Sequence, residues 1–133
     1  MSQPKNKRSL GSHTLLYPQP ALLVGTYDAN GTPNLMMAAW GGICSSNPAS
    51  VMVGIRKERW TYDALLEKKA FTVGIASEKM LAAADFTGIA SGRNVNKFEQ
   101  AGLTPVRGEM VDAPYADECP VILECKLLQH VDA

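Results

Sequence analysis

Residues that could bind a flat aromatic ring are concentrated between Asn34 and Ser46. The stretch 34–40, NLMMAAW, contains Met36, Met37 and Trp40, and small or hydroxyl-bearing residues follow it. Methionine and tryptophan can form close apolar walls, and small residues let the backbone approach the polar edge of a ring. This composition is typical of a site for an amphipathic plate such as a flavin.

A basic cluster lies a short distance further along the chain. It consists of Arg56, Lys57 and Arg59, followed by Thr61 at the expected start of a helix. A phosphate with about 1.5 to 2 negative charges is held well by hydroxyls, guanidinium groups and helix N-terminal N–H groups. The two stretches together suit flavin mononucleotide (FMN). The alternative is a core hairpin with a solvated basic turn, and the residues taken alone favour it, because methionine and tryptophan are usually core residues and charge clusters usually face water.

The sequence offers few residues that could perform catalysis without a cofactor. His13 and His130 are the only histidines, which disfavours a histidine triad or a multi-histidine metal site. Cys44, Cys119 and Cys125 form no Cys-x-x-Cys pair, so we expect reduced thiols, no disulfide framework and no metal site. Cys44 could be a nucleophile, but a packed, inert thiol is the more common role of such a residue. No catalytic residue is identified, and we expect a cofactor to supply the chemistry.

Size and charge restrict the partners. The 133 residues suffice for one domain, and thirteen basic residues balance thirteen acidic ones. We therefore expect a small-molecule ligand, with neither nucleic acid nor a membrane as partner. The sequence has no apolar run of about 20 residues and no secretory signal at its start, so a cytoplasmic location is predicted.

Five short runs rich in β-branched and apolar residues predict strands. Runs 21–27 and 34–40 flank Asp28-Ala29-Asn30-Gly31, whose residues tolerate the positive φ of a hairpin turn. The other three runs are VMVGI at 51–55, FTVGI at 71–75 and VILECKLL at 121–128.

Three helices are predicted between these strands. The first spans residues 60–69. Ser77 is expected to cap a second helix that runs to Asp85, and Asn94 to cap a third that Gly102 ends as a left-handed residue. Such irregular insertion of short helices favours a mainly β, α+β or barrel architecture over a doubly wound sheet.

A dinucleotide-binding fold is not supported. Gly41 and Gly42 are expected in a loop, without a third glycine at dinucleotide spacing and without a strand-to-helix context. The Walker motif for nucleotide phosphates is absent as well.

Two long segments resemble the flavin reductase family, in particular its flavoredoxin-type branch. They are TLLYPQPALLVGTYDANGTPNLMMAAWGGICSSNP, from Thr14, and SGRNVNKFEQAGLTP at 91–105, and the similarity continues to CPVILECKL. The resemblance implies a split β-barrel that binds FMN without a covalent link, as a homodimer with the cofactor near the subunit interface. It also implies redox function. The residues matching the family's cofactor site are Asn34, Met36, Met37, Ala38, Trp40, Cys44, Ser45, Ser46, Arg56, Thr61, Ser91, Gly92 and Lys97.

The resemblance also suggests an incomplete barrel. Residues 1–13 are expected to be a flexible arm and residues 14–133 a partial domain, because family members usually continue for about fifty residues of further barrel strands. Two explanations stay open: either the sequence is a truncated piece of a longer chain, or a partner subunit covers the open edge of the sheet.

Three functions fit the resemblance. The first is an oxidoreductase that passes hydride from NAD(P)H through FMN to free flavin or another acceptor. The second is a flavoredoxin-type electron carrier with redox-protein partners. The third is a flavin-binding module without turnover. The sequence does not choose between them, because the redox chemistry belongs to the cofactor.

Overall fold

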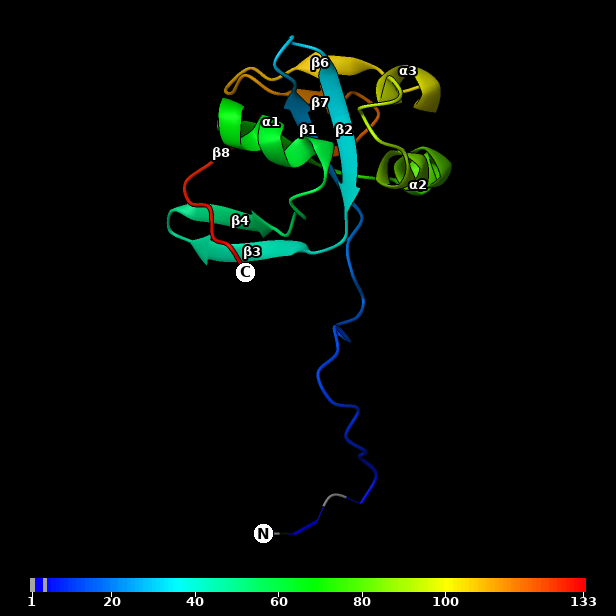
Figure 1. Cartoon of the computed structure of the whole chain (residues 1–133), viewed down its shortest axis with the longest axis vertical. Helices are drawn as coiled ribbons and strands as arrows, with labels where there is room; N and C mark the ends of the chain where they lie inside the picture. Colours follow the sequence, from blue (N-terminus) through cyan, green and yellow to red (C-terminus); the bar gives the residue numbers. More distant parts are fainter. Residues whose placement is uncertain (1, 4) are drawn as a thin grey trace.

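The computed structural model of the chain describes residues 2–3 and 5–133; Met1 and Pro4 of the predicted arm lie outside the described residues. An extended segment leads away from a body of strands and short helices (Figure 1), and regular structure begins at Leu22. The elements are β1 (Leu22–Tyr27), β2 (Pro33–Ala38), β3 (Gly41–Ser46), β4 (Ala49–Val53), α1 (Trp60–Lys68), β5 (Ala70–Ile75), the 3-10 helix η1 (Glu78–Met80), α2 (Leu81–Ile89), α3 (Lys97–Ala101), β6 (Pro105–Arg107), β7 (Pro114–Ala116) and β8 (Val121–Lys126).

A four-stranded antiparallel sheet is the centre of the body. Its strand order is β2-β1-β5-β8, and its register pairs Leu23 with Met37 and Val73 with Leu123. The hairpins β3–β4 and β6–β7 form two separate two-stranded sheets. The predicted mainly β, α+β fold of the split-barrel type is confirmed. In the described residues the barrel is not closed.

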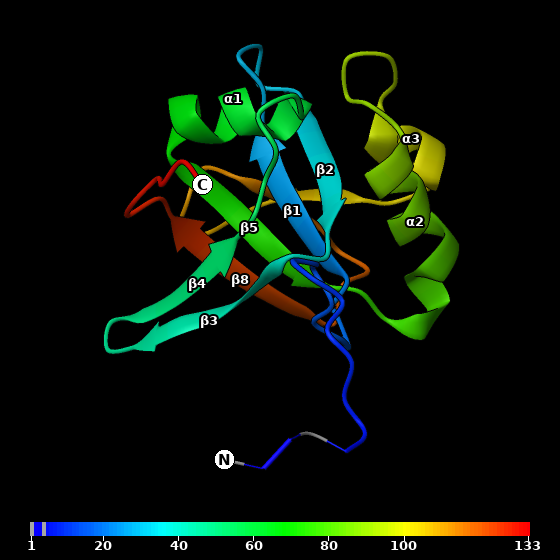
Figure 2. The ribbon, with the colours of Figure 1, turned by 60° about the horizontal axis from the view of Figure 1, so that its bottom comes forward.

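One face of the central sheet packs on α2 and α3. Leu23 and Leu35 point to this face and contact a cluster that includes Met80, Ala84 and Phe98. Burying each large side chain contributes about 1.5 to 3 kcal/mol relative to exposure. Figure 2 shows both helices on the same side of β2. This packing fixes where α2 ends and where α3 begins.

The opposite face is covered by α1 and approached by the β3–β4 hairpin. Val24, Met36 and Phe71 pack there with Leu65 of α1, and Val51 of β4 lies against the same cluster. Since successive residues of a strand point to opposite faces, β2 presents its even-numbered residues to α1 and its odd-numbered ones to α2.

Several local predictions differ from the structure. Gly41 and Gly42 belong to a strand rather than a loop, because β3 pairs along its length with β4. The Ser77 side chain makes no capping hydrogen bond, and the following helix continues to Ile89. Asn96, not Asn94, caps α3 by accepting a hydrogen bond from the Glu99 backbone N–H at 3.2 Å.

Other local predictions are confirmed. The five predicted strands occur as β1, β2, β4, β5 and β8, with ends shifted by a few residues. Gly102 ends α3 with a φ of 67°, as expected for a left-handed cap. Among residues 2–3 and 5–133, no helix is long and apolar enough to cross a membrane.

Candidate functional site

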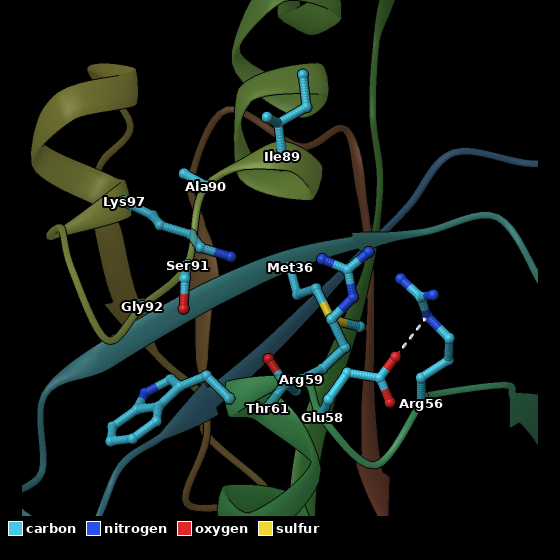
Figure 3. A pocket seen from close by; sticks show the side chains of 11 residues that line it. Met36, Arg56, Glu58, Arg59, Thr61, Ile89, Ala90, Ser91, Gly92 and Lys97 are labelled. Carbon is cyan, nitrogen blue, oxygen red and sulfur yellow. Dashed lines mark ion pairs between the residues drawn. The ribbon is translucent and has the colours of Figure 1, made fainter.

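A pocket of about 170 Å³ lies where the start of α1 meets the segment that joins α2 to α3 (Figure 3). Helix α1, strand β2 and the two ends of that joining segment all contribute to its walls. The lining residues are Met36, Arg56, Glu58, Arg59, Trp60, Thr61, Ile89, Ala90, Ser91, Gly92 and Lys97.

Lys97 places a buried positive charge at this pocket. It is the first residue of α3, its side chain is 3% exposed, and its Nζ donates a hydrogen bond to the Thr87 carbonyl oxygen at 2.7 Å. Burial, and then the nearby charge of Arg59, lower the pKa of Lys97 to about 8. No carboxylate forms an ion pair with Lys97 in the described part of the chain. A buried, unpaired ammonium is costly, so the pocket favours an anionic ligand.

Arg59 provides a second cation. It directly precedes α1, and its Nη1 donates to the Gly88 carbonyl oxygen at 3.2 Å, which anchors the guanidinium beside the end of α2. The first N–H groups of α1 lack acceptors within the helix and carry the positive end of its dipole. Cation and helix start therefore meet at one wall of the pocket.

The other basic residues of the predicted phosphate-binding cluster contribute less to the pocket. Arg56 lines it but is mostly exposed, and its Nε pairs with Glu58 Oε1 at 3.4 Å, as the dashed line in Figure 3 marks. Lys57 instead pairs with Asp132 at 2.9 Å. Of these basic residues, Arg59 is therefore the one that a hydrogen bond to the Gly88 carbonyl oxygen holds in the pocket.

A hydrogen bond from β2 orients the hydroxyl of Thr61. Asn34 Nδ2 donates to Thr61 Oγ1 at 3.1 Å, and both residues are buried. Because the hydroxyl oxygen accepts this bond, its hydrogen is free to donate in another direction. Thr61 lines the pocket, so it can present an O–H donor to a ligand there.

Gly92 is required by the tight packing around this hydrogen bond. A Cβ at this position would lie 2.6 Å from Asn34 Oδ1 and 2.6 Å from Trp60 Cδ1. Trp60 in turn has the Arg93 guanidinium over its ring, 5.4 Å from the ring centroid. The absence of a side chain at residue 92 therefore lets the α2–α3 segment approach β2 and α1.

The structure brings about half of the predicted site residues together. Met36 and Arg56 line the pocket, and Asn34 lies directly behind it through its bond to Thr61. The other predicted residues in its wall are Thr61, Ser91, Gly92 and Lys97.

The remaining predicted residues lie elsewhere. Met37 points to the opposite face of β2 and packs on the α2 cluster, and Ala38 is buried in the core beneath α1. Trp40 is 55% exposed at the start of the β3–β4 hairpin. Cys44, Ser45 and Ser46 lie on β3, outside this pocket.

Sequence reasoning did not select every lining residue. Arg59 belonged to the basic cluster but not to the set implied by the family resemblance, and Glu58, Trp60, Ile89 and Ala90 were not predicted. Ile89 and Ala90 are an ordinary helix end whose role depends on the packing of α2 against β2, so no local signal marks them. Trp60, adjacent to Thr61, could have been found from its position at the helix start.

The three cysteines are free thiols, and Cys44 is exposed, not packed as is more common for such a residue. Cys119 is buried, and burial together with the charge of Glu118 raises the pKa of its thiol to about 11. Cys44 is exposed and Cys125 half-buried, and neither is in a disulfide. Within the described ranges, no group of three His, Cys, Asp or Glu side chains is placed to hold a metal ion.

Residues 13–133 match the family model of the flavin reductase like domain. The chain belongs to this family. A solved flavoredoxin of Desulfovibrio vulgaris (Miyazaki F) is 51% identical to it, with a TM-score of 0.91 over 95% of this chain and 69% of that one. A flavoredoxin from Methanosarcina acetivorans is 28% identical, with a TM-score of 0.88 over 97% of this chain and 68% of that one.

Curated relatives in the family are longer than this chain. An uncharacterized protein of Aquifex aeolicus is 30% identical over 88% of this chain, which spans 62% of that protein's length. The chain spans 45% of a second relative, from Aeropyrum pernix, at 34% identity. The pocket brings together two cations, a hydroxyl and a helix start, which are groups that can bind an anion.

Proposed function

We propose that the chain binds one FMN without a covalent link and uses it in oxidoreductase chemistry of the flavin reductase kind. The observation that carries the proposal is the pair of cations, Lys97 and Arg59, which share one pocket and form no ion pair among the described residues. Glu58, the carboxylate that also lines this pocket, pairs with Arg56. A phosphate would neutralise the two cations and accept hydrogen bonds from both. The family of the chain agrees with this ligand.

The residues of the pocket fit the phosphate end of FMN. Lys97 and Arg59 would supply charge, Thr61 and Ser91 hydroxyl donors, and the start of α1 its N–H groups. At about 170 Å³ the pocket is smaller than the roughly 300 to 1,000 Å³ of a typical ligand site. It therefore suits the phosphate and adjoining sugar chain, and the ring would lie outside it.

Bound FMN would supply hydride and single-electron transfer, which are properties of its ring. The chain's own residues bind and orient the cofactor. Asn34 holds Thr61 in place, and Gly92 lets the α2–α3 segment close against both. These residues would affect how tightly FMN binds and how it is oriented. The electron donor and the electron acceptor therefore have to be identified separately.

NAD(P)H is the electron donor that we propose for an enzymatic role. The specific alternative is an electron carrier, which the high similarity to a protein called flavoredoxin favours. A flavin-binding module without turnover is the third possibility that the same pocket supports. The three differ in how bound flavin responds to a reduced nicotinamide.

The test begins with the purified protein, loaded with FMN and desalted. We expect a yellow protein that releases FMN, not FAD, on heating, and that bleaches when NADH or NADPH is added without oxygen. A yellow protein that stays yellow with both nucleotides but accepts electrons from a chemical reductant would support the carrier. FMN bound no more tightly than riboflavin would contradict the phosphate pocket, because only FMN can use the two cations.

We further propose that the chain acts as a homodimer. The four-stranded sheet leaves apolar side chains of β5 and β8 exposed, including Ile75, Val121 and Leu123. A second subunit would cover such a face. Sedimentation over a hundredfold dilution tests this assembly, and a monomer at every concentration would contradict it.

A further inference from the structure

Arg93 joins two walls of the Lys97–Arg59 pocket without lining it. It lies in the segment between α2 and α3, and its Nη1 donates a hydrogen bond to the Glu58 carbonyl oxygen at 3.2 Å. Its guanidinium also lies over the Trp60 ring, 5.4 Å from the ring centroid. Glu58 and Trp60 line the pocket, whereas Arg93 does not. Arg93 therefore contacts the protein wall of the site and not the space that a ligand would fill.

Arg93 and Arg59 form a crossed pair of bridges between these walls. Arg59 precedes α1 and donates to the Gly88 carbonyl oxygen near the end of α2. Arg93 follows α2 and donates in the opposite direction, to the carbonyl oxygen of the residue directly before Arg59. The backbone that Arg93 holds is therefore the backbone that carries the Arg59 side chain into the pocket (Figure 3).

A turn that starts at Ser91 fixes the position of Arg93. The Ser91 carbonyl oxygen accepts hydrogen bonds from the N–H groups of Asn94 and Val95 at 3.0 and 3.2 Å. The Ser91 hydroxyl oxygen accepts another from the Arg93 N–H at 3.3 Å. Ser91 itself lines the pocket, so the turn connects one wall directly to the arginine that reaches the other.

The contacts of Arg93 require the shape of its side chain as well as its charge. Arg93 forms no ion pair among the described residues, and its contacts to Glu58 and Trp60 are both to the start of α1. A planar guanidinium can lie over an aromatic ring and donate hydrogen bonds in its own plane at the same time. An ammonium group is a compact point charge and cannot reproduce both contacts.

We propose that Arg93 is a positioning residue of the FMN phosphate site, which holds the backbone of residues 58–59 and the Trp60 ring so that Arg59 meets a phosphate in place. The inference rests on the proposed FMN binding and identifies a residue outside the pocket that sets its affinity. A preorganised cation binds more tightly, because less freedom of the protein is lost on binding. Replacing Arg93 should therefore act on the phosphate through Arg59.

The main test is the variant Arg93→Lys, which keeps the positive charge but removes the planar guanidinium. Its matched control is Arg107→Lys, the same exchange at an exposed arginine of β6 that pairs with Asp112 and does not line the pocket. Dissociation constants for FMN and riboflavin are measured by fluorescence titration. We expect FMN affinity to fall by about three- to tenfold in Arg93→Lys. Riboflavin affinity, and both affinities in the control, should stay nearly unchanged.

A second background tests whether Arg93 acts through Arg59. The substitution Arg93→Lys is repeated in a protein that carries Arg59→Met. Because the cation that Arg93 positions is absent there, the loss of FMN affinity caused by Arg93→Lys should largely disappear. Additive losses in the double variant would overturn the proposal, since they would show that the two arginines act independently.

The remaining outcomes separate this inference from the proposed function. Wild-type FMN affinity in Arg93→Lys would overturn the role of Arg93 and leave the cofactor site intact. Equal losses for FMN and riboflavin would also overturn it, because they would indicate a general change in the fold. A wild-type protein that binds FMN no more tightly than riboflavin would overturn the phosphate site itself, and this inference with it.

Discussion

Replacing Lys97 by methionine should weaken FMN binding and stabilise the cofactor-free protein at the same time. Methionine keeps the length and most of the apolar volume of the buried stem but removes the charge. The pKa of Lys97 falls from the ordinary 10.5 to about 8, mainly through burial. At about 1.4 kcal/mol for each pKa unit, this shift represents about 3 kcal/mol of unfavourable free energy that the folded protein carries at neutral pH.

The net gain in stability should be smaller than that figure. The substitution also removes the hydrogen bond from Lys97 Nζ to the Thr87 carbonyl oxygen, worth about 1.5 kcal/mol or more for a charged donor. We therefore expect Lys97→Met to raise the free energy of unfolding by about 1 to 2 kcal/mol in urea titrations at pH 7. Lys79→Met, at an exposed position on η1, serves as the control and should change it little.

The pH dependence provides a second measurement. Because the folded-state pKa is lowered, the unfolded chain binds more protons than the folded one between about pH 8 and 10.5, so the wild type gains stability as pH rises through this range. A methionine side chain cannot titrate, so the Lys97→Met variant should lack this contribution.

Ligand binding should respond in the opposite direction. The loss of one charged hydrogen bond to phosphate predicts an FMN affinity lower by about 1.5 to 3 kcal/mol, with riboflavin affinity nearly unchanged. Fluorescence titration measures both. Lower stability in Lys97→Met, or equal losses for FMN and riboflavin, would refute the assignment of Lys97 as a strained, buried anion ligand.

Three further predictions follow from the same geometry. Arg59→Ala should weaken FMN binding more than Arg56→Ala, because Arg59 is anchored on the Gly88 carbonyl whereas Arg56 is exposed and paired with Glu58; equal effects in the fluorescence titration would contradict this ranking. Gly92→Ala should lower the free energy of unfolding by about 1 to 3 kcal/mol through overpacking against Asn34 and Trp60, while Gly42→Ala, with open space at its Cβ position, should be tolerated in the same urea assay. Glu124 accepts hydrogen bonds from three backbone N–H groups of residues 109–111, which lower its pKa, so stability present at neutral pH should be lost as pH falls through that lowered pKa; an unchanged acid limb in Glu124→Gln unfolding curves would exclude this contribution.

Local sequence was sufficient to predict the elements whose determinants are contiguous. The β-branched runs that form β1, β5 and β8 bury at least one apolar face wherever they pair, so their strand character follows from composition. Gly102 was predictable for a similar reason, because a helix end that needs a positive φ favours glycine. The basic cluster at 56–61 was found because its members are neighbours in the chain, and it does lie at the start of a helix.

Tertiary packing decided the roles that depend on direction and pairing. Strand β3 exists because β4 pairs with it, although its glycines and serines have little intrinsic strand preference. Met36 and Met37 are adjacent in sequence, yet the pleat of β2 sends one toward the pocket and the other into the α2 core.

The basic residues also show that sequence alone does not determine which side chains line the pocket. Lys57 and Arg59 are equally positive in sequence, but only the position of α2, with its Gly88 carbonyl, determines which of them lies in the pocket. Lys97 resembles an exposed helix lysine until α2 and α3 pack together and bury it. The sequence by itself determined which residue types were available for the proposed anion site. The tertiary structure decided which of them converge, because burial and side-chain direction arise from contacts between segments far apart in the chain.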